Sequence, residues 1–440
     1  MRVIPALILV FLGLCLAAWG ALNLCFLLKG AIRARRERLS PAPEEPTFLL
    51  KSRLVPDVAI LAAPPDASES SFRFVRRLAR LYFGHLEIVL VLDGPSDDEL
   101  AAWKREFHLV PVPRHEVEEL ETRPLCQVYA STEPLPLIFV NKERGGEGDC
   151  LNAGINLTSA PVIGLVDWNA DVSEDALLRL ICPMIDEPES IHAVCAAAPA
   201  APASGRAARL YHLTFLRQWL CRCAGLSVWN SFLPAPGSFL LLKRDAVVRA
   251  GGFRAMSGCA LEMVMRLHRL AQAENRSYRI RLLPGAISRP AAPRSKREMQ
   301  ERIAREQAAV AATLARHMGM LYGFGGISRL AIPGLFCSRL LVPLIETAFL
   351  ALAIPALVLH WMAPLDLALL TACAASGGTL ISMTAVVLEP FAAGSRIPPR
   401  QLAALFFTSI VENIGHRQWR NVHLIALFLR GFFAAPSEVN

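Results

Sequence analysis

The stretch VIGLVDWNADVSEDALLRL, Val162 to Leu180, decides the fold. It opens as a short run without polar residues, which is typical of a strand buried on both faces of a sheet. Three polar side chains follow two residues apart, Asp167, Asn169 and Asp171, and an amphipathic helical pattern comes next. Because parallel sheets bind ligands at the carboxyl ends of their strands, this stretch predicts a site for a metal ion and a nucleotide phosphate.

Five similar apolar runs surround this one and alternate with helical patterns between residues 55 and 325. They are VAILAA from Val58, EIVLVLD from Glu87, LIFVN from Leu137, HAVCAAA from His192 and SFLLLK from Ser238. This order predicts an α/β fold with a mostly parallel sheet covered by helices. Asp93 and Asp167 both fall where a predicted strand ends.

The remainder of the chain is too apolar for an ordinary soluble protein. Of its 440 residues 53% are hydrophobic, and the mean hydropathy is +0.38. Val3 to Leu28 carries no charge and, as a helix, would reach about 39 Å, enough to span a bilayer. It is too long for a signal peptide and no small-residue cleavage site follows it. We therefore predict an N-terminal transmembrane helix.

Two further apolar spans are predicted from Ala331 to Met362 and from Asp366 to Leu388, and shorter apolar pieces punctuated by arginines follow. We interpret these pieces as helices lying in the membrane interface. A carboxylate inside a span, Glu346, is a functional candidate because an unpaired charge in hydrocarbon is costly. The alternative is an ion pair with Arg339, two helical turns earlier.

The cations cluster beside the apolar spans. The net charge is +8, and five Lys or Arg residues follow the first span between Lys29 and Arg38. This asymmetry predicts three spans, with the N-terminus outside and the globular domain and C-terminus in the cytoplasm of a bacterial-type plasma membrane. It argues against nucleic acid as a partner, because the cations do not line an aromatic-rich groove. The scattered cysteines, eleven in all, suit a reducing compartment.

These patterns predict five regions: a transmembrane helix over 1–30, a basic linker over 31–54, an α/β domain over 55–325, two transmembrane helices over 326–391, and interfacial helices with a tail over 392–440.

The order of these regions resembles the membrane-bound family 2 glycosyltransferases, which include cellulose-synthase-like and poly-N-acetylglucosamine-synthase-like enzymes. Five stretches carry the resemblance in addition to the opening one, whose Asp167, Asn169 and Asp171 lie over the family's metal-binding Asp-x-Asp. They are EIVLVLDGPSDDEL, RGGEGDCLNAGIN, GSFLLLKRDAVVRAGGF, ENIGHRQ from Glu412, and RIARE at Arg302–Glu306. The last is a decayed form of the family's Gln-x-x-Arg-Trp motif, which keeps Arg305 and has lost the Gln and the Trp. The resemblance implies a GT-A-like fold that binds a nucleotide-sugar, with a UDP-sugar as the favoured donor, through Asp93, Asn152, Asp167 and Arg305.

The resemblance also implies a chemistry that this sequence only partly retains. In the family a divalent cation neutralises the donor diphosphate, and a carboxylate base removes a proton from the acceptor. Here Asn169 replaces the second metal-binding Asp, which weakens an expected Mg²⁺ or Mn²⁺ site. Glu147 stands where the family has a Lys, and Ala260 stands at the position of the base. Glu262 lies about 200° around the helix from Ala260, so it faces away from the position of the base. It matches a family Glu that we interpret as structural. The resemblance therefore implies that no catalytic residue is intact.

Each candidate residue has a plainer interpretation. Asp93 is also a turn former, Asp171 could cap the following helix, and Arg305 could be a solvated charge on a helix.

Two functions remain open. The chain is either a silent or partner-dependent relative that binds a nucleotide-sugar and assists a synthase or another subunit of envelope polysaccharide assembly, or an active inverting enzyme that moves a sugar to a lipid or glycan acceptor.

Overall fold

The computed structural model describes residues 3–39, 55–114, 117–168, 170–199, 205–235, 237–256, 258–274, 278–285, 287–322 and 327–434. The chain divides into two compact units. The sheet unit comprises Arg36–Ala198 and Leu233–Ala291, and the helical unit comprises Met1–Arg35, Pro199–Phe232 and Ala292–Asn440. The 199–232 and 292–325 segments, which the sequence assigned to the α/β domain, therefore belong to the helical unit.

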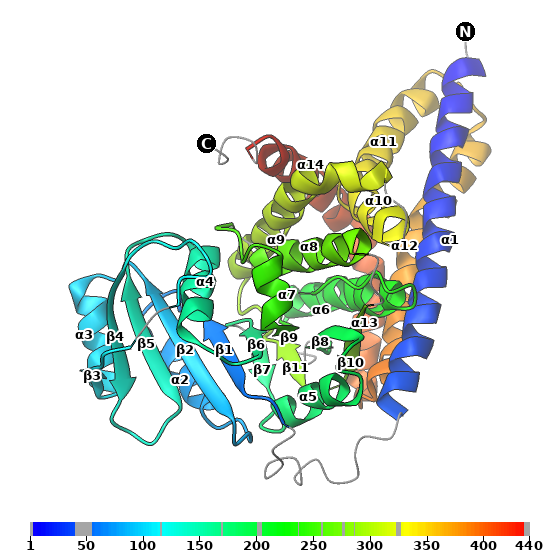
Figure 1. Ribbon diagram of the computed structural model, residues 1–440. Coiled ribbons are helices and arrows are strands. Elements are labelled where there is room, and N and C mark those ends of the chain that lie inside the picture. Colours follow the sequence, from blue (N-terminus) through cyan, green and yellow to red (C-terminus); the bar gives the residue numbers. More distant parts are fainter. Residues whose placement is uncertain are drawn as a thin grey trace. The chain divides into compact units, whose positions relative to one another are not determined.

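The sheet unit is built on a mixed nine-stranded sheet of order β10-β8-β9-β6-β1-β2-β5-β4-β3 (Figure 1). The central strands β6, β1, β2 and β5 are parallel, as the uninterrupted apolar runs predict, whereas β9 pairs antiparallel with both β6 and β8. The strands are β1 Val58–Ala62, β2 Leu86–Asp93, β3 Leu109–Pro111, β4 Leu125–Ser131, β5 Leu137–Lys142, β6 Val162–Val166, β8 Ile191–Ala197, β9 Phe239–Lys243 and β10 Arg279–Pro284; β7 Ala170–Val172 and β11 Ser288–Pro290 form a separate pair.

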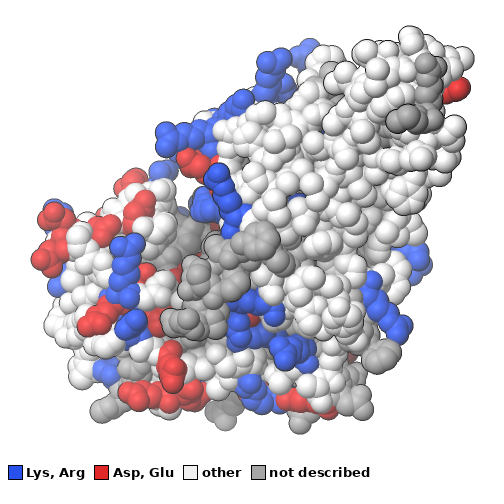
Figure 2. All heavy atoms as spheres, turned by 90° about the horizontal axis from the view of Figure 1, so that it is seen from above, with Lys and Arg blue, Asp and Glu red and all other residues white. Residues whose placement is uncertain are grey.

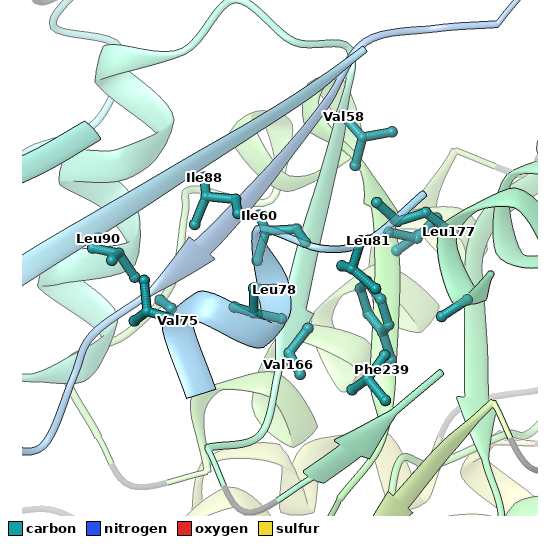
Figure 3. Close-up of a cluster of buried hydrophobic side chains, with 14 of the residues drawn as sticks. Val58, Ile60, Val75, Leu78, Leu81, Ile88, Leu90, Val166, Leu177 and Phe239 are labelled. Carbon is teal, nitrogen blue, oxygen red and sulfur yellow. The ribbon is translucent and has the colours of Figure 1, made fainter. Parts of the chain in front are cut away.

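Helices cover this sheet and supply its core. They are α2 Glu69–Leu78, α3 Asp97–Glu106, α4 Glu147–Leu157, α5 Ala176–Asp186, α7 Arg244–Arg249 and α8 Cys259–Ala273. Figure 3 shows Val75 and Leu78 of α2 packed with Ile60 of β1 and with Ile88 and Leu90 of β2. All five side chains are at most 2% exposed. Burying each such side chain stabilises the fold by about 1.5–3 kcal/mol, so the strand ends around β1 have a rigid support.

The helical unit is almost entirely helix, as its continuous apolar stretches predict. It contains α1 Val3–Leu39, α6 Arg206–Gln218, η2 Trp219–Gly225, α9 Lys296–His317, η3 Met318–Tyr322, η4 Ile327–Ala331, α10 Ile332–Phe336, η5 Cys337–Leu341, α11 Val342–Val358, α12 Pro364–Ala393, α13 Pro399–Val411, η6 Glu412–His416 and α14 Arg417–Ala434. The boundary between the two units falls within α1, because the residues of this helix from Arg36 onward belong to the sheet unit.

Three segments among the described residues are long and apolar enough to cross a membrane: Val3–Leu39, Arg329–Val358 and Pro364–Ala393. Their number and places agree with the sequence prediction. Many of their large apolar side chains are exposed. The upper right part of the face in Figure 2 carries very few charged residues, whereas Lys and Arg side chains lie along its lower right edge. The predicted linker from residue 31 begins instead as helix to Leu39, because Ala, Arg, Glu and Leu all favour helix.

Two glycines let α1 pack closely against η2. A Cβ added at Gly30 would lie 2.1 Å from the carbonyl oxygen of Leu220, and one added at Gly225 would lie 2.9 Å from that of Phe26. Any larger residue at Gly30 would have to push two backbones apart. The candidate N-terminal span is therefore fixed to the π-helical segment η2 by direct backbone contact.

Candidate nucleotide-sugar site

The predicted site lies at the carboxyl edge of the central strands. In the sheet β2 and β6 flank β1 on its two sides, and all three are parallel. Strand order thus reverses at β1, which is where open α/β sheets form their ligand crevice. Asp93 is the last residue of β2 and Asp167 follows the last residue of β6, so the fold places both predicted carboxylates on this edge.

Asp93 holds the turn before α4. Its Oδ1 accepts a hydrogen bond from the Gly145 amide at 2.7 Å, and its Oδ2 accepts one from the Gly146 amide at 3.0 Å. Gly146 has a φ of +89°, a conformation that favours glycine. In this structure Asp93 therefore shapes the glycine turn, and its contact with a nucleotide stays a prediction.

A buried lysine that the sequence analysis did not single out supports the same turn. Lys142 ends β5 directly opposite Asp93 in the sheet register. Its side chain is fully buried, with Nζ in an ion pair with Asp149 and 3.8 Å from Asp93 Oδ1. Burying a lone ammonium is very costly, so the two carboxylates account for its position. The predicted strand LIFVN stops one residue before Lys142, which is why the sequence analysis did not place this lysine at a strand end.

Asn152 joins α4 to the turn that contains Phe253. Its Nδ2 donates to the Phe253 carbonyl at 2.9 Å and its Oδ1 accepts from the Phe253 amide at 2.6 Å. The side chain is only 7% exposed. Both the nitrogen and the oxygen of the amide therefore make hydrogen bonds within the protein, and its contact with a nucleotide-sugar stays a prediction.

Asp167 is fixed to the start of β9. Its Oδ2 accepts a hydrogen bond from the Gly237 amide at 3.0 Å. Gly237 has a φ of +74°, and an added Cβ would lie 2.5 Å from the Cβ of Pro290. Only glycine fits there, so this hydrogen bond orients the carboxylate at the strand end.

Of the other two predicted metal ligands, the structure describes only Asp171. Asp171 lies on β7 and pairs with Arg77 of α2 at 2.6 Å, with 74% of its side chain exposed, so it does not cap the next helix. Asn169 lies outside the described residues. Among the residues that the structure does describe, no three His, Cys, Asp or Glu side chains form a group that could hold a metal. Taken alone, the described residues do not fit a tight divalent-cation site.

The first two residues of α8, Cys259 and Ala260, offer no proton acceptor at neutral pH. Ala260 is the second residue of the helix, and Gly258 at its N-cap adopts a φ of +76°. Burial, and to a lesser degree the nearby Glu147 carboxylate, raises the pKa of the preceding Cys259 well above its usual value. Cys259 therefore stays a neutral thiol at neutral pH and cannot replace a carboxylate base.

Glu262, one turn into α8, is structural as expected. It is fully buried and pairs with Arg266 at 2.8 Å and with Arg254 at 3.6 Å. The guanidinium of Arg266 also donates to the carbonyl oxygens of Ala250 and Gly252. This network fixes the turn before α8.

The remaining candidates lie in the helical unit. Arg305 is exposed on α9, which agrees with its plainer interpretation as a solvated charge, and its role as a phosphate clamp stays a prediction. Glu346 pairs with Arg417 at 2.9 Å, whereas Arg339 pairs with Glu306. The alternative interpretation, an ion pair between Glu346 and Arg339, is therefore wrong, because helices distant in sequence supply nearer partners.

Comparisons with known proteins support the fold. No family model and no curated protein sequence matches the chain. A solved mannosyltransferase from Pyrobaculum calidifontis, in complex with GDP-mannose and Mn²⁺, is similar at a TM-score of 0.57 and 17% identity, covering 93% of this chain and 99% of that one. A glucosyl-3-phosphoglycerate synthase from Mycobacterium tuberculosis matches at a TM-score of 0.40 and 14% identity, covering 63% of this chain and 86% of that one. The chain is thus similar in fold, over nearly its whole length, to a GT-A glycosyltransferase.

Proposed function

We propose that this chain is a membrane-anchored, nucleotide-sugar-binding protein whose own transfer chemistry is degraded. In the assembly of envelope polysaccharide, it is either catalytically inactive or active only together with a partner synthase. One observation carries the proposal: the edge at β1 keeps Asp93 and Asp167, while the first two residues of α8 are Cys259, a neutral thiol, and Ala260. A donor can dock on such a site, but no positioned base removes the acceptor proton.

The membrane arrangement belongs to the same proposal. The three apolar segments cross the plasma membrane with the N-terminus outside, and α13 and α14 lie in the cytoplasmic interface. The five cations between Lys29 and Arg38 favour the cytoplasm on that side of the first span. Protease protection of an N-terminal tag in sealed, inside-out vesicles tests this, since the tag should be shielded.

Donor binding is tested by calorimetric titration of UDP and of GDP into the detergent-purified chain, with and without Mn²⁺. Asp167→Ala should abolish metal-dependent binding, and Asp98→Ala, an exposed acid on α3, should leave it unchanged. Asn169→Asp should tighten Mn²⁺ binding, because it restores a charged oxygen ligand. Absence of binding of either nucleotide under both conditions would leave only a scaffold role.

The alternative is an active inverting glycosyltransferase with a lipid or glycan acceptor. Similarity of fold to a mannosyltransferase over 93% of the chain favours it. Release of UDP from a UDP-sugar by the purified chain, lost in Asp167→Ala and retained in Asp98→Ala, would establish it in place of the silent form.

A further inference from the structure

A cavity of about 260 Å³ lies within the helical unit. It is lined by residues of α1, α6, η2, α9, α10, η5, α11, α12 and α14, and it does not involve the sheet unit. At about 30 Å³ per water molecule, it has room for roughly nine waters or a small polar head group. No step assigned above to nucleotide-sugar binding uses it.

The wall of this cavity combines apolar side chains with an excess of arginine. On one side lie Trp19, Leu22 and Phe26 of α1, near the end of that span where the cations begin. The described arginines lining the cavity number five: Arg217, Arg222, Arg339, Arg417 and Arg420. A wall of this kind, beside candidate spans, suits a ligand with an anionic head and an apolar tail.

Three glutamates pair with these arginines, so two positive charges remain in excess among the described residues. Glu412 pairs with Arg217 at 2.7 Å and with Arg420 at 2.8 Å. Glu306 pairs with Arg222 and Arg339, and Glu346 pairs with Arg417. Burial, followed by repulsion from Arg339, lowers the pKa of Arg222, as expected where cations crowd together.

Two buried donors on α14 have no acceptor among the described residues. Asn421 lines the cavity and is 4% exposed, yet its Nδ2 makes no hydrogen bond. The Nε of Arg420, on the adjacent residue, is also buried without a partner. Unsatisfied buried donors cost about 1–3 kcal/mol each. Both atoms are closed to a water molecule in this structure, so each donor must turn toward the cavity before an anion there can accept its hydrogen bond.

We infer that this cavity binds the phosphate group of an anionic membrane lipid, with the lipid tail along the apolar wall of α1. Arginine and amide donors are the groups that bind phosphate oxygens. A lipid is favoured over a soluble phosphate compound because α1, α11 and α12, which supply much of the wall, are the candidate spans. This site lies beyond the proposed nucleotide-sugar function and does not depend on it.

Two variants test the site, and one has a matched control. Asn421→Leu removes one of the unpaired donors at nearly constant volume. Gly334→Leu fills the cavity, because Gly334 lines it and a Cβ there meets nothing within 4 Å. Gly377→Leu is its control, since Gly377 also has open space but is not among the lining residues. Both glycines lie within helices, where leucine is favoured over glycine, so these two variants should fold.

The measurement is native mass spectrometry of the full chain in detergent, with phosphatidic acid, phosphatidylcholine or inorganic phosphate added. The wild type should bind phosphatidic acid at least about tenfold more tightly than phosphatidylcholine, and Asn421→Leu should reduce this preference by about tenfold, as expected for one hydrogen bond to a charged group. Gly334→Leu should abolish the preference and Gly377→Leu should retain it. Equal binding of the two lipids, a preference unchanged in Gly334→Leu, or displacement of phosphatidic acid by an equal concentration of inorganic phosphate would overturn the inference.

Discussion

At the scale of single residues, the start of α8 offers the sharpest contrast with an active transferase. The helix begins as it should, with Gly258 at its N-cap and a buried, ion-paired Glu262. At the position where the resemblance implies a base, the helix has a neutral thiol and a methyl group, Cys259 and Ala260. The scaffold for a base is therefore present without the base.

Ala260→Asp should restore activity if the rest of the site binds its substrates. A carboxylate in the first turn of α8 is stabilised by the helix dipole, and a positioned base accelerates transfer by about 10²–10⁴-fold. The rate of UDP release from a UDP-sugar, in membranes that contain the acceptor, measures the gain.

Ala101→Asp is the matched control, because Ala101 is an exposed residue of α3 in the same unit. No gain in Ala260→Asp, in a protein that still binds UDP, would show that the loss of chemistry lies elsewhere.

At the scale of elements, the candidate site is held by contacts that the sequence does not reveal. The apolar runs predicted β1, β2, β5, β6, β8 and β9 because buried central strands consist of little else. The short strands β3, β7 and β11 lack such a pattern. Asp93 and Asp167 could be predicted at the sheet edge because each follows directly on the apolar run that marks its strand.

The partners of those carboxylates could not be predicted, because they come from distant segments. Asp93 meets the Gly145–Gly146 turn 52 residues on, and Asn152 meets Phe253 across 101 residues. Such pairings depend on the final packing of the loops. The same holds for Glu346, whose partner Arg417 lies 71 residues away.

Asn152→Ala should loosen the junction between α4 and the turn before α8. It leaves the amide and carbonyl of Phe253 buried without partners, at a cost of about 1–3 kcal/mol for each group. Hydrogen exchange of the full chain should become at least tenfold faster in peptides that cover 147–157 and 250–256.

Gln272→Ala, which removes an exposed amide on α8, should not change exchange in those peptides. Unaltered exchange in Asn152→Ala, together with weaker UDP binding, would instead support the nucleotide contact that the sequence suggested for this residue.

At the scale of the whole molecule, the helical unit contains several buried ion pairs between glutamate and arginine. Because these carboxylates titrate, the stability of the protein depends on pH. Burial alone would raise the pKa of Glu412, but Arg217 and Arg420 lower it to about 2 from an ordinary value of 4.5. A carboxylate with a lowered pKa stabilises the folded state above its unfolded pKa and loses that effect as pH falls towards its folded pKa.

The stability of the detergent-purified chain against heat should therefore not vary with the titration of Glu412 above about pH 5. It should fall by a few kcal/mol between about pH 4.5 and pH 2. Glu412→Gln should lower the midpoint at neutral pH, because it leaves two buried arginines without their carboxylate. The same variant should lose most of the acid dependence, and an equally steep acid transition in that variant would assign the effect to other groups.

The close packing of Gly30 against Leu220 also has a consequence for biogenesis. Residue 220 is synthesised 190 positions after residue 30, which takes roughly 10–40 s at ordinary rates of translation. During that interval Gly30 has no η2 segment to pack against. The nascent chain therefore passes through a stage in which the face of α1 around Gly30 is uncovered, and the backbone contact with Leu220 forms only after η2 has been made.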